Sequence, residues 1–164
     1  DRPTSGKVYI NGTDIFAMND DELAIFRRRQ VGIIYQFYNL IPILNVEENM
    51  AIPMELDGRK VEKAQMDDML LRLGLTERRT HLPNELSGGQ QQRTSIGRAL
   101  ITRPSIVLAD EPTGNLDTKA SNEIMHLLKT SNRELNQTII MITHNMELAK
   151  AADRTIMIED GKIR

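Results

Sequence analysis

The sequence of 164 residues contains no cysteine, which excludes disulfide bonds, thiolate metal sites and a cysteine nucleophile. It has no apolar stretch long enough to span a bilayer, so we expect any membrane role to depend on a partner. It also has no large excess of one charge, since the formal net charge is -2. The basic footprint of proteins that bind nucleic acid or anionic lipid is therefore missing.

The densest basic run is Arg27-Arg28-Arg29, in a segment that also carries Asp20, Asp21 and Glu22. We interpret it as the solvated face of a helix rather than a binding patch. With 40% hydrophobic and 27% charged residues, the composition is typical of a globular protein with a sizeable core. The length indicates one domain.

Strand patterns alternate with helix patterns along the chain. Strands are predicted over 7–11, 31–35, 106–110 and 138–143, helices over 19–29, after Asn45, over 62–73, 89–102, 118–135 and 145–152, and a hairpin at Asp160-Gly161. The apolar runs 106–110 and 138–143 are continuous, which is typical of strands covered on both faces. We therefore predict an α/β fold with a parallel sheet core and antiparallel pieces at both ends.

Polar side chains follow three of these strands. Gln36 comes after 31–35, Asp110 and Glu111 end the second run, and His144 follows the third. Because parallel strands end at one edge of a sheet, we expect these residues to meet at one rim, where ligands of α/β proteins bind. One carboxylate there is suited to Mg²⁺ and the next to orienting an attacking water.

Ser87, Gly88 and Gly89 begin the predicted helix 89–102. The unpaired N–H groups and positive dipole end of a helix N-terminus suit phosphate oxygens, and two glycines let an anion approach closely. The same residues also suit an ordinary helix cap without a ligand.

These residues together resemble the nucleotide-binding domain of an ABC transporter. "LSGGQ" (86–90) is similar to the family's signature motif, and "IVLADE" (106–111) to Walker B with its glutamate. "NLD" (115–117) resembles the D-loop, Gln36 the Q-loop glutamine and His144 the switch histidine. The order and spacing of the motifs agree over essentially the whole chain.

The wording "LADEPTGNLD" and "VGIIYQFYNLIPILNVEEN" is most similar to the branch that serves lipoprotein release, macrolide export and cell-division complexes. The resemblance implies a P-loop NTPase-like parallel sheet core with an antiparallel β piece. It also implies a helical subdomain over about 45–100 and a Walker B-to-switch region over 106–144.

For catalysis, the resemblance implies that Glu111 polarises the attacking water and that His144 contacts the γ-phosphate. It implies that Asp110 supports Mg²⁺, and that Gln36 senses metal and water while linking the site to a membrane partner. The expected cofactors are ATP and Mg²⁺. The reaction would proceed by positioning and electrostatics.

For assembly, the resemblance implies that Ser87, Gly88, Gly89 and Gln90 bind nucleotide held by the opposite subunit. Asp117 would contact that neighbour across the dimer. The expected partners are a second nucleotide-binding domain and a transmembrane permease, with no nucleic acid. The protein would be cytoplasmic and peripheral on the inner face of the membrane.

The phosphate-gripping P-loop of this family, G-x-x-x-x-G-K-[ST], has no match in the chain. Gly6-Lys7 would need glycine at position 1 and Ser or Thr at position 8, where Asp1 and Val8 stand. Gly161-Lys162 is followed by isoleucine. We interpret 3–6 as a turn, Lys7 as the start of an edge strand, and Val8 as facing the sheet. We expect an N-terminally truncated cassette that lacks a segment of roughly forty residues with the P-loop.

Two alternatives stay open. One is a non-catalytic cassette that cannot bind ATP by itself. The other is an ABC ATPase acting on DNA or ribosomes, and the balanced charge speaks against DNA. Gln36 and Leu86 are only 50 positions apart, and the segment between them shows no sustained heptads of a coiled coil.

Overall fold

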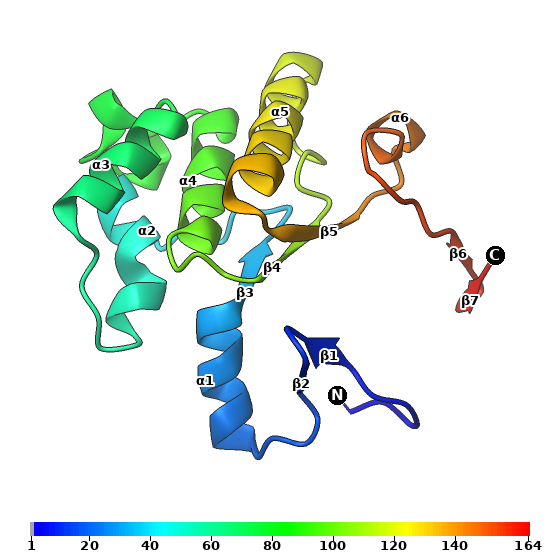
Figure 1. Cartoon of the computed structure of the whole chain (residues 1–164). Helices are drawn as coiled ribbons and strands as arrows, with labels where there is room; N and C mark the ends of the chain where they lie inside the picture. The colour runs from blue at the N-terminus through cyan, green and yellow to red at the C-terminus, as the bar shows by residue number, and fades with distance from the viewer. Residues whose placement is uncertain (1) are drawn as a thin grey trace.

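A three-stranded parallel sheet forms the centre of the computed structural model, which describes residues 2–164 (Figure 1). Its strands, in the order β3-β4-β5, are β3 (Val31–Ile34), β4 (Ile106–Asp110) and β5 (Thr138–Ile142). Val31 pairs with Ile106, and Ile106 with Thr138. The predicted parallel α/β core is confirmed. Asp1, one of the positions compared with the P-loop, lies outside the described residues.

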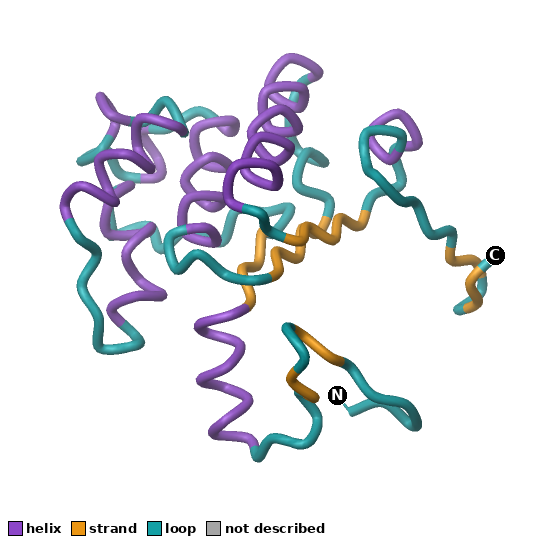
Figure 2. Tube along the Cα trace, viewed as in Figure 1, coloured by secondary structure: helices purple, strands orange, loops and turns teal. Residues whose placement is uncertain are grey.

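Helices form a layer on one side of this sheet (Figure 2). They are α2 (Val46–Glu55), α3 (Lys63–Arg72), α4 (Gly88–Leu100) and α5 (Thr118–Leu135). Two short 3-10 turns, Thr76–Arg78 and Pro83–Glu85, connect α3 to α4. Helix α4 packs against β3, α2 and α5, so it lies between the sheet and α2, beside α5, which itself packs against β5. A shift of α4 would therefore affect both the neighbouring helices and the strands.

Side-chain caps explain where several helices begin. Asn19 accepts a hydrogen bond from the N–H of Glu22 at 2.9 Å, and the Glu22 side chain bonds back, which starts α1 (Asp20–Gln30). Asn45 and Glu48 form the same capping box before α2. Because each box satisfies two otherwise unpaired N–H groups, both helices begin at the asparagines, as predicted.

The core joins the helical layer to the inner face of the sheet. Ile34 and Val107 from the strands are fully buried, as are Ile96 and Leu100 of α4. The methionines in this core are Met50, Met54, Met66 and Met69. Methionine fills irregular gaps between aliphatic side chains, and these four methionines do so in the core.

The other face of the sheet is open, contrary to the prediction of strands covered on both faces. Ile33, Leu108 and Ile140 point to this face and are 41%, 38% and 49% exposed. Successive right-handed crossovers in one direction place their helices on the same side of a sheet. The crossovers β3→β4 and β4→β5 therefore put α4 and α5 on one face, and no described helix covers the other in the same way.

Both ends of the chain form small antiparallel hairpins, as predicted. They are β1 (Tyr9–Ile10) with β2 (Thr13–Asp14), and β6 (Ile158–Glu159) with β7 (Lys162–Ile163). The turn residues Asn11-Gly12 and Asp160-Gly161 all have positive φ, the geometry that two-residue hairpin turns require. The C-terminal hairpin stands away from the helical layer (Figure 1).

Two local predictions were wrong. Lys7 does not begin a strand, and Val8 is 43% exposed instead of facing the sheet, because β1 pairs only with β2. The helix predicted over 145–152 is the shorter α6 (Met146–Ala149), which has no buried residue to support further turns. The arginine run lies on a largely exposed face of α1, as predicted, and Arg28 and Arg29 in addition pair with Asp57 after α2.

Candidate functional site

The predicted rim residues come together where the three strands end. Glu111 follows β4, and its Oε1 accepts a hydrogen bond from the backbone N–H of His144 at 2.9 Å. The same oxygen lies 2.6 Å from Nδ1 of the His144 ring. The backbone N–H of Glu111 donates to the carbonyl oxygen of Ile142, the last residue of β5. The structure therefore joins Glu111 and His144 into one pair, across adjacent strands.

The pair has a sheltered member and an exposed one. The Glu111 side chain is 18% exposed and that of His144 is 86% exposed. An ionised carboxylate only accepts hydrogen bonds, so Nδ1 carries the proton in this contact and Nε2 is left towards solvent. Glu111 has a φ of +44°, in the left-handed region that few residues other than glycine adopt. Such a conformation at a strand end is common at functional sites.

Gln36 lies against the loop that follows Glu111. Its Nε2 is 2.7 Å from the position that a Cβ on Gly114 would take, so a side chain at position 114 would require Gln36 to move. Asn115 Nδ2 donates to the Gln36 carbonyl oxygen at 3.0 Å. Residues 35–45, between β3 and α2, form the loop that carries Gln36, called the Gln36 loop below. It is in direct contact with the loop 111–117 at the rim, as the strand order predicts.

Asp110 ends β4 at the rim, with an exposed side chain that makes no hydrogen bond or ion pair within residues 2–164. With Gln36 it offers one carboxylate and one amide oxygen. The described residues contain no cluster of three or more acidic or histidine side chains that could hold a metal ion. Mg²⁺ commonly takes one or two protein oxygens and completes its shell with water and phosphates. The donor set therefore fits Mg²⁺ shared with a phosphate ligand.

The signature residues form the start of α4. Ser87 Oγ accepts from the N–H of Gln90 at 3.3 Å, and Gln90 Oε1 accepts from the N–H of Ser87 at 2.9 Å. Both polar side chains are thus engaged in a capping box. Gly88 and Gly89 occupy the first turn, where backbone N–H groups have no acceptor within the helix.

The start of α4 makes no hydrogen bond to the Glu111–His144 pair within residues 2–164. A Cβ on Gly89 would instead lie 3.4 Å from Cβ of Ala120, near the start of α5. Asp117 caps α5 by accepting from the N–H of Ala120 at 2.8 Å. The predicted nucleotide-binding residues therefore form a second group.

The Gly6-Lys7 sequence near the N-terminus is remote from both groups. Lys7 Nζ pairs with the Asp14 carboxylate at 3.6 Å, across the β1–β2 hairpin. Asn11, at the hairpin tip, donates to Oγ of Ser105 at 2.6 Å. Ser105 directly precedes β4, so the hairpin tip lies at the opposite end of the strand from the rim. The interpretation of this segment as a turn agrees with the φ of +86° at Gly6.

Comparison with known proteins decides the family. A family profile described as "ABC transporter" matches residues 1–114. The chain belongs to the ABC transporter family. It is 46% identical to the ABC transporter ATP-binding protein YtrE of Bacillus subtilis, over 99% of this chain and 71% of that protein. It is 43% identical to the lipoprotein-releasing system ATP-binding protein LolD 1 of Chlorobium chlorochromatii, over 99% of this chain and 68% of that protein.

Solved ABC cassettes share the fold. The ATP-binding cassette MJ0796, solved as a dimer in a post-hydrolysis state bound to ADP and Pi, superposes with a TM-score of 0.85 at 39% identity. The match covers 99% of this chain and 73% of that one. These relatives confirm the α/β cassette fold and the resemblance to ATP-binding subunits of lipoprotein-release type. Within residues 2–164, no helix has the length and apolar character needed to cross a membrane.

Sequence patterns did not predict the contacts of two polar residues in this ABC cassette. Arg98 of α4 donates to the carbonyl oxygens of Asn39 and Tyr38, at 2.5 and 2.8 Å, and burial lowers its pKa. Asn49 of α2 is fully buried and holds the last part of the Gln36 loop, residues 41–45, through four hydrogen bonds. For Asn49 the signal is a polar residue beside the apolar Val46, Ile52 and Pro53 on one helix face.

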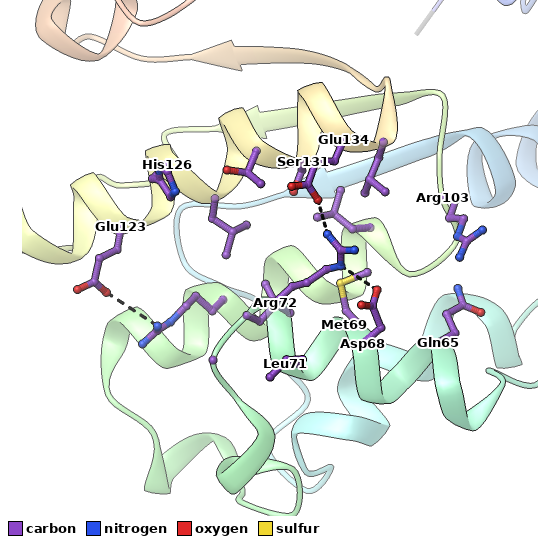
Figure 3. Close-up of a pocket in the computed structure, with 17 residues that line it drawn as sticks. Gln65, Asp68, Met69, Leu71, Arg72, Arg103, Glu123, His126, Ser131 and Glu134 are labelled. Carbon is purple, nitrogen blue, oxygen red and sulfur yellow. Dashed lines mark hydrogen bonds and ion pairs between the residues drawn. The ribbon is translucent and has the colours of Figure 1, made fainter.

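One recess lies away from the predicted site. It has a volume of about 510 Å³ and lies between α3, α4 and α5 (Figure 3). Arg72 spans it, pairing with Asp68 at 2.8 Å and with Glu134 across the gap. None of the rim or signature residues lines it. The recess is therefore a gap between packed helices, bridged by charge, and separate from the rim.

Proposed function

We propose that this chain is the ATP-hydrolysing part of an ABC exporter or lipoprotein-release system, in which two cassettes close on MgATP and drive the membrane subunits. In this proposal, residues 45–100 act as the helical subdomain and 106–144 carry the hydrolytic residues. The observation that carries it is the contact between Glu111 and His144 at the rim. It places a carboxylate and an imidazole side by side, where the strands of α/β proteins present ligands.

Glu111 would accept a hydrogen bond from the attacking water through its carboxylate and hold that water in line. His144 is positioned by the same carboxylate, and its exposed ring would reach the γ-phosphate. Asp110 and Gln36 would hold Mg²⁺, which neutralises charge on the phosphates when bound. Each of these residues acts by orienting a partner, so small displacements of the rim loops would reduce the rate strongly.

The signature group, which consists of Ser87, Gly88, Gly89, Gln90 and Asp117, would bind nucleotide held by the opposite cassette. The N–H groups of Gly88 and Gly89 head α4, and together with Ser87 and Gln90 they would meet phosphates held by a second copy or a paralogue. Asp117, beside them at the start of α5, would contact the neighbour. This arrangement accounts for the lack of hydrogen bonds between the signature group and the Glu111–His144 pair within the described part of the chain. The relative MJ0796 is dimeric.

The Gln36 loop would receive the transmembrane permease. Phe37 and Ile43 are 72% and 81% exposed, and Ile41 between them is also exposed. A cluster of exposed apolar side chains marks an interaction surface. Its occupant would be a permease segment, because Gln36 directly adjoins it and would report the docking to the rim. The protein would then work in the cytoplasm, on the inner face of the membrane.

Residues 1–164 contain no P-loop motif, so we expect these residues alone to bind MgATP weakly. Loss of even one positioned donor typically costs about 3 kcal/mol of transition-state stabilisation, and a P-loop supplies several. Titration of the chain with fluorescently labelled ATP should show no saturation in the micromolar range. Micromolar binding would contradict this part of the proposal.

Closure on MgATP can be tested in the full-length protein carrying Glu111→Gln, which should bind nucleotide without turning it over. Addition of MgATP should convert monomer to dimer on size exclusion. A further Ser87→Arg substitution should abolish the dimer, whereas Asn84→Arg, at an exposed position just before the signature, should leave it intact. Dimer formation that survives Ser87→Arg would remove the signature group from the proposed interface.

A further inference from the structure

Gln92 lies one turn into α4, and its side chain is 0% exposed. Its Nε2 donates to the carbonyl oxygen of Pro112 at 2.7 Å and to that of Tyr35 at 3.3 Å. Pro112 directly follows Glu111, and Tyr35 directly precedes Gln36. One side-chain amide therefore touches both loops that carry rim residues.

The oxygen of the same amide has no partner. Gln92 Oε1 is buried and accepts no hydrogen bond within residues 2–164. The amide cannot turn over to relieve it, because two carbonyl oxygens accept only from the nitrogen. A buried amide oxygen without a donor lowers folding stability. Stability alone therefore does not explain a glutamine at this position.

No other side chain of α4 bonds both loops in the described part of the chain. Arg98 reaches only the farther part of the Gln36 loop, at Tyr38 and Asn39. Gln91, the neighbour of Gln92, donates to Leu86 instead, outside both loops. The double contact is specific to Gln92.

We propose that Gln92 is a positioning residue that sets the separation between the Gln36 loop and the Glu111 loop and ties both to the signature helix. A shift of α4 would then move both rim loops together, which couples the signature group of a cassette to its own hydrolytic rim. The inference rests on the proposed function for the roles of Gln36 and Glu111, whereas the contacts of Gln92 stand without it.

Gln137 offers a matched control. It is 4% exposed, its Nε2 donates to the carbonyl oxygen of Pro104 at 3.1 Å, and its Oε1 is also buried without a partner. Pro104 precedes β4, whereas Pro112 follows it. Gln92 and Gln137 thus make the same kind of contact at opposite ends of one strand.

The experiment compares Gln92→Met and Gln137→Met in the chain by NMR. The readouts are the side-chain amide signal of Gln36 and the backbone amide of His144, together with the exchange rate of that amide. Because both variants remove a buried amide with one unpartnered oxygen, their thermal stabilities should change by similar amounts. Only Gln92→Met should shift the two rim signals and speed exchange of the His144 amide, by about tenfold, through local opening of the rim.

A second variant keeps the test valid if Gln92→Met does not fold. Gln92→Glu keeps the shape of the side chain, and its protonated form still donates one hydrogen bond. As the pH falls, its rim signals should therefore approach those of the wild type measured at the same pH. Gln137→Glu should not move them. Unchanged rim signals in the Gln92 variants, or equal shifts in both pairs, would overturn the proposal. A positive NMR result with a full-length protein that fails to hydrolyse ATP would preserve the coupling and refute the proposed function.

Discussion

The spacing between β3 and α4 determines how the signature helix meets the rim, and Gly32 sets it. A Cβ built on Gly32 would lie 2.5 Å from the carbonyl oxygen of Ala99 in α4 and 3.1 Å from Cγ of Pro104. The nearest atom belongs to a helix backbone, which cannot swing away as a side chain can. Gly32→Ala therefore forces the strand and the helix apart.

The size of the effect follows from this distance. Carbon and carbonyl oxygen approach to about 3.3 Å, so Gly32→Ala requires a separation of about 0.8 Å. Overpacking against backbone costs about 3 kcal/mol, and the lower chain entropy of alanine returns about 1 kcal/mol. We expect a net loss of about 2 kcal/mol in the free energy of unfolding. The Gln92–Tyr35 contact, 3.3 Å in the wild type, would also pass beyond hydrogen-bond range.

Gly89 and Gly97, both in α4, provide controls for Gly32→Ala. The free energy of unfolding of all three variants would be measured in urea by circular dichroism. At Gly97 a Cβ would lie 2.7 Å from Leu73 Cδ1 and from Met50 Cε, which are movable side-chain ends. Gly97→Ala should change stability by less than about 1 kcal/mol, since the gain in helix propensity offsets the crowding. Gly89→Ala, with 3.4 Å to the Ala120 Cβ, should stabilise slightly. If Gly32→Ala were as stable as Gly97→Ala, the close approach of β3 and α4 would be refuted.

Two further results are expected. Burial raises the pKa of the Asp57 carboxyl, but the hydrogen bond from Arg29 and the charges of Arg29, Arg59 and Arg28 outweigh it and hold the pKa below its usual 3.8. This carboxylate therefore stabilises the fold above about pH 4 and loses that effect as the pH falls. The free energy of unfolding of Asp57→Asn should depend less steeply on pH in the acid range. An equal pH dependence in the variant and the wild type would contradict the pairing. The open sheet face should drive self-association, which light scattering should detect at high concentration and Ile140→Lys should reduce; a monomeric wild type would argue against it.

Much of this architecture could be predicted because local signals agreed with the fold. Asn45 followed by Glu48 is a complete capping box in the sequence, and α2 begins there. The span predicted for α5, 118–135, is the observed one, since Asp117 caps it and Asn136 ends it in the left-handed conformation. The meeting of Glu111 and His144 followed from adjacent parallel strands, each ending in a polar residue.

What failed depends on contacts that periodicity does not contain. The run 138–143 has the same apolar pattern whether one or both faces of the strand are covered, so the pattern by itself does not reveal the exposure of Ile140. The ion pairs of Arg28 and Arg29 join residues 28 positions apart or more, through Asp57. The role of Gln92 requires knowing that two loops converge on one buried amide. Tertiary geometry alone supplies this information.

The central claim is that the Glu111–His144 pair at the rim carries ATP hydrolysis. The most direct test is the steady-state ATPase rate of the full-length protein with Glu111→Gln, against Glu123→Gln as a control on the exposed surface of α5. We predict that Glu111→Gln lowers kcat by about 10²- to 10⁴-fold with little change in nucleotide affinity, and that the control retains wild-type turnover. Turnover retained in Glu111→Gln would contradict the account.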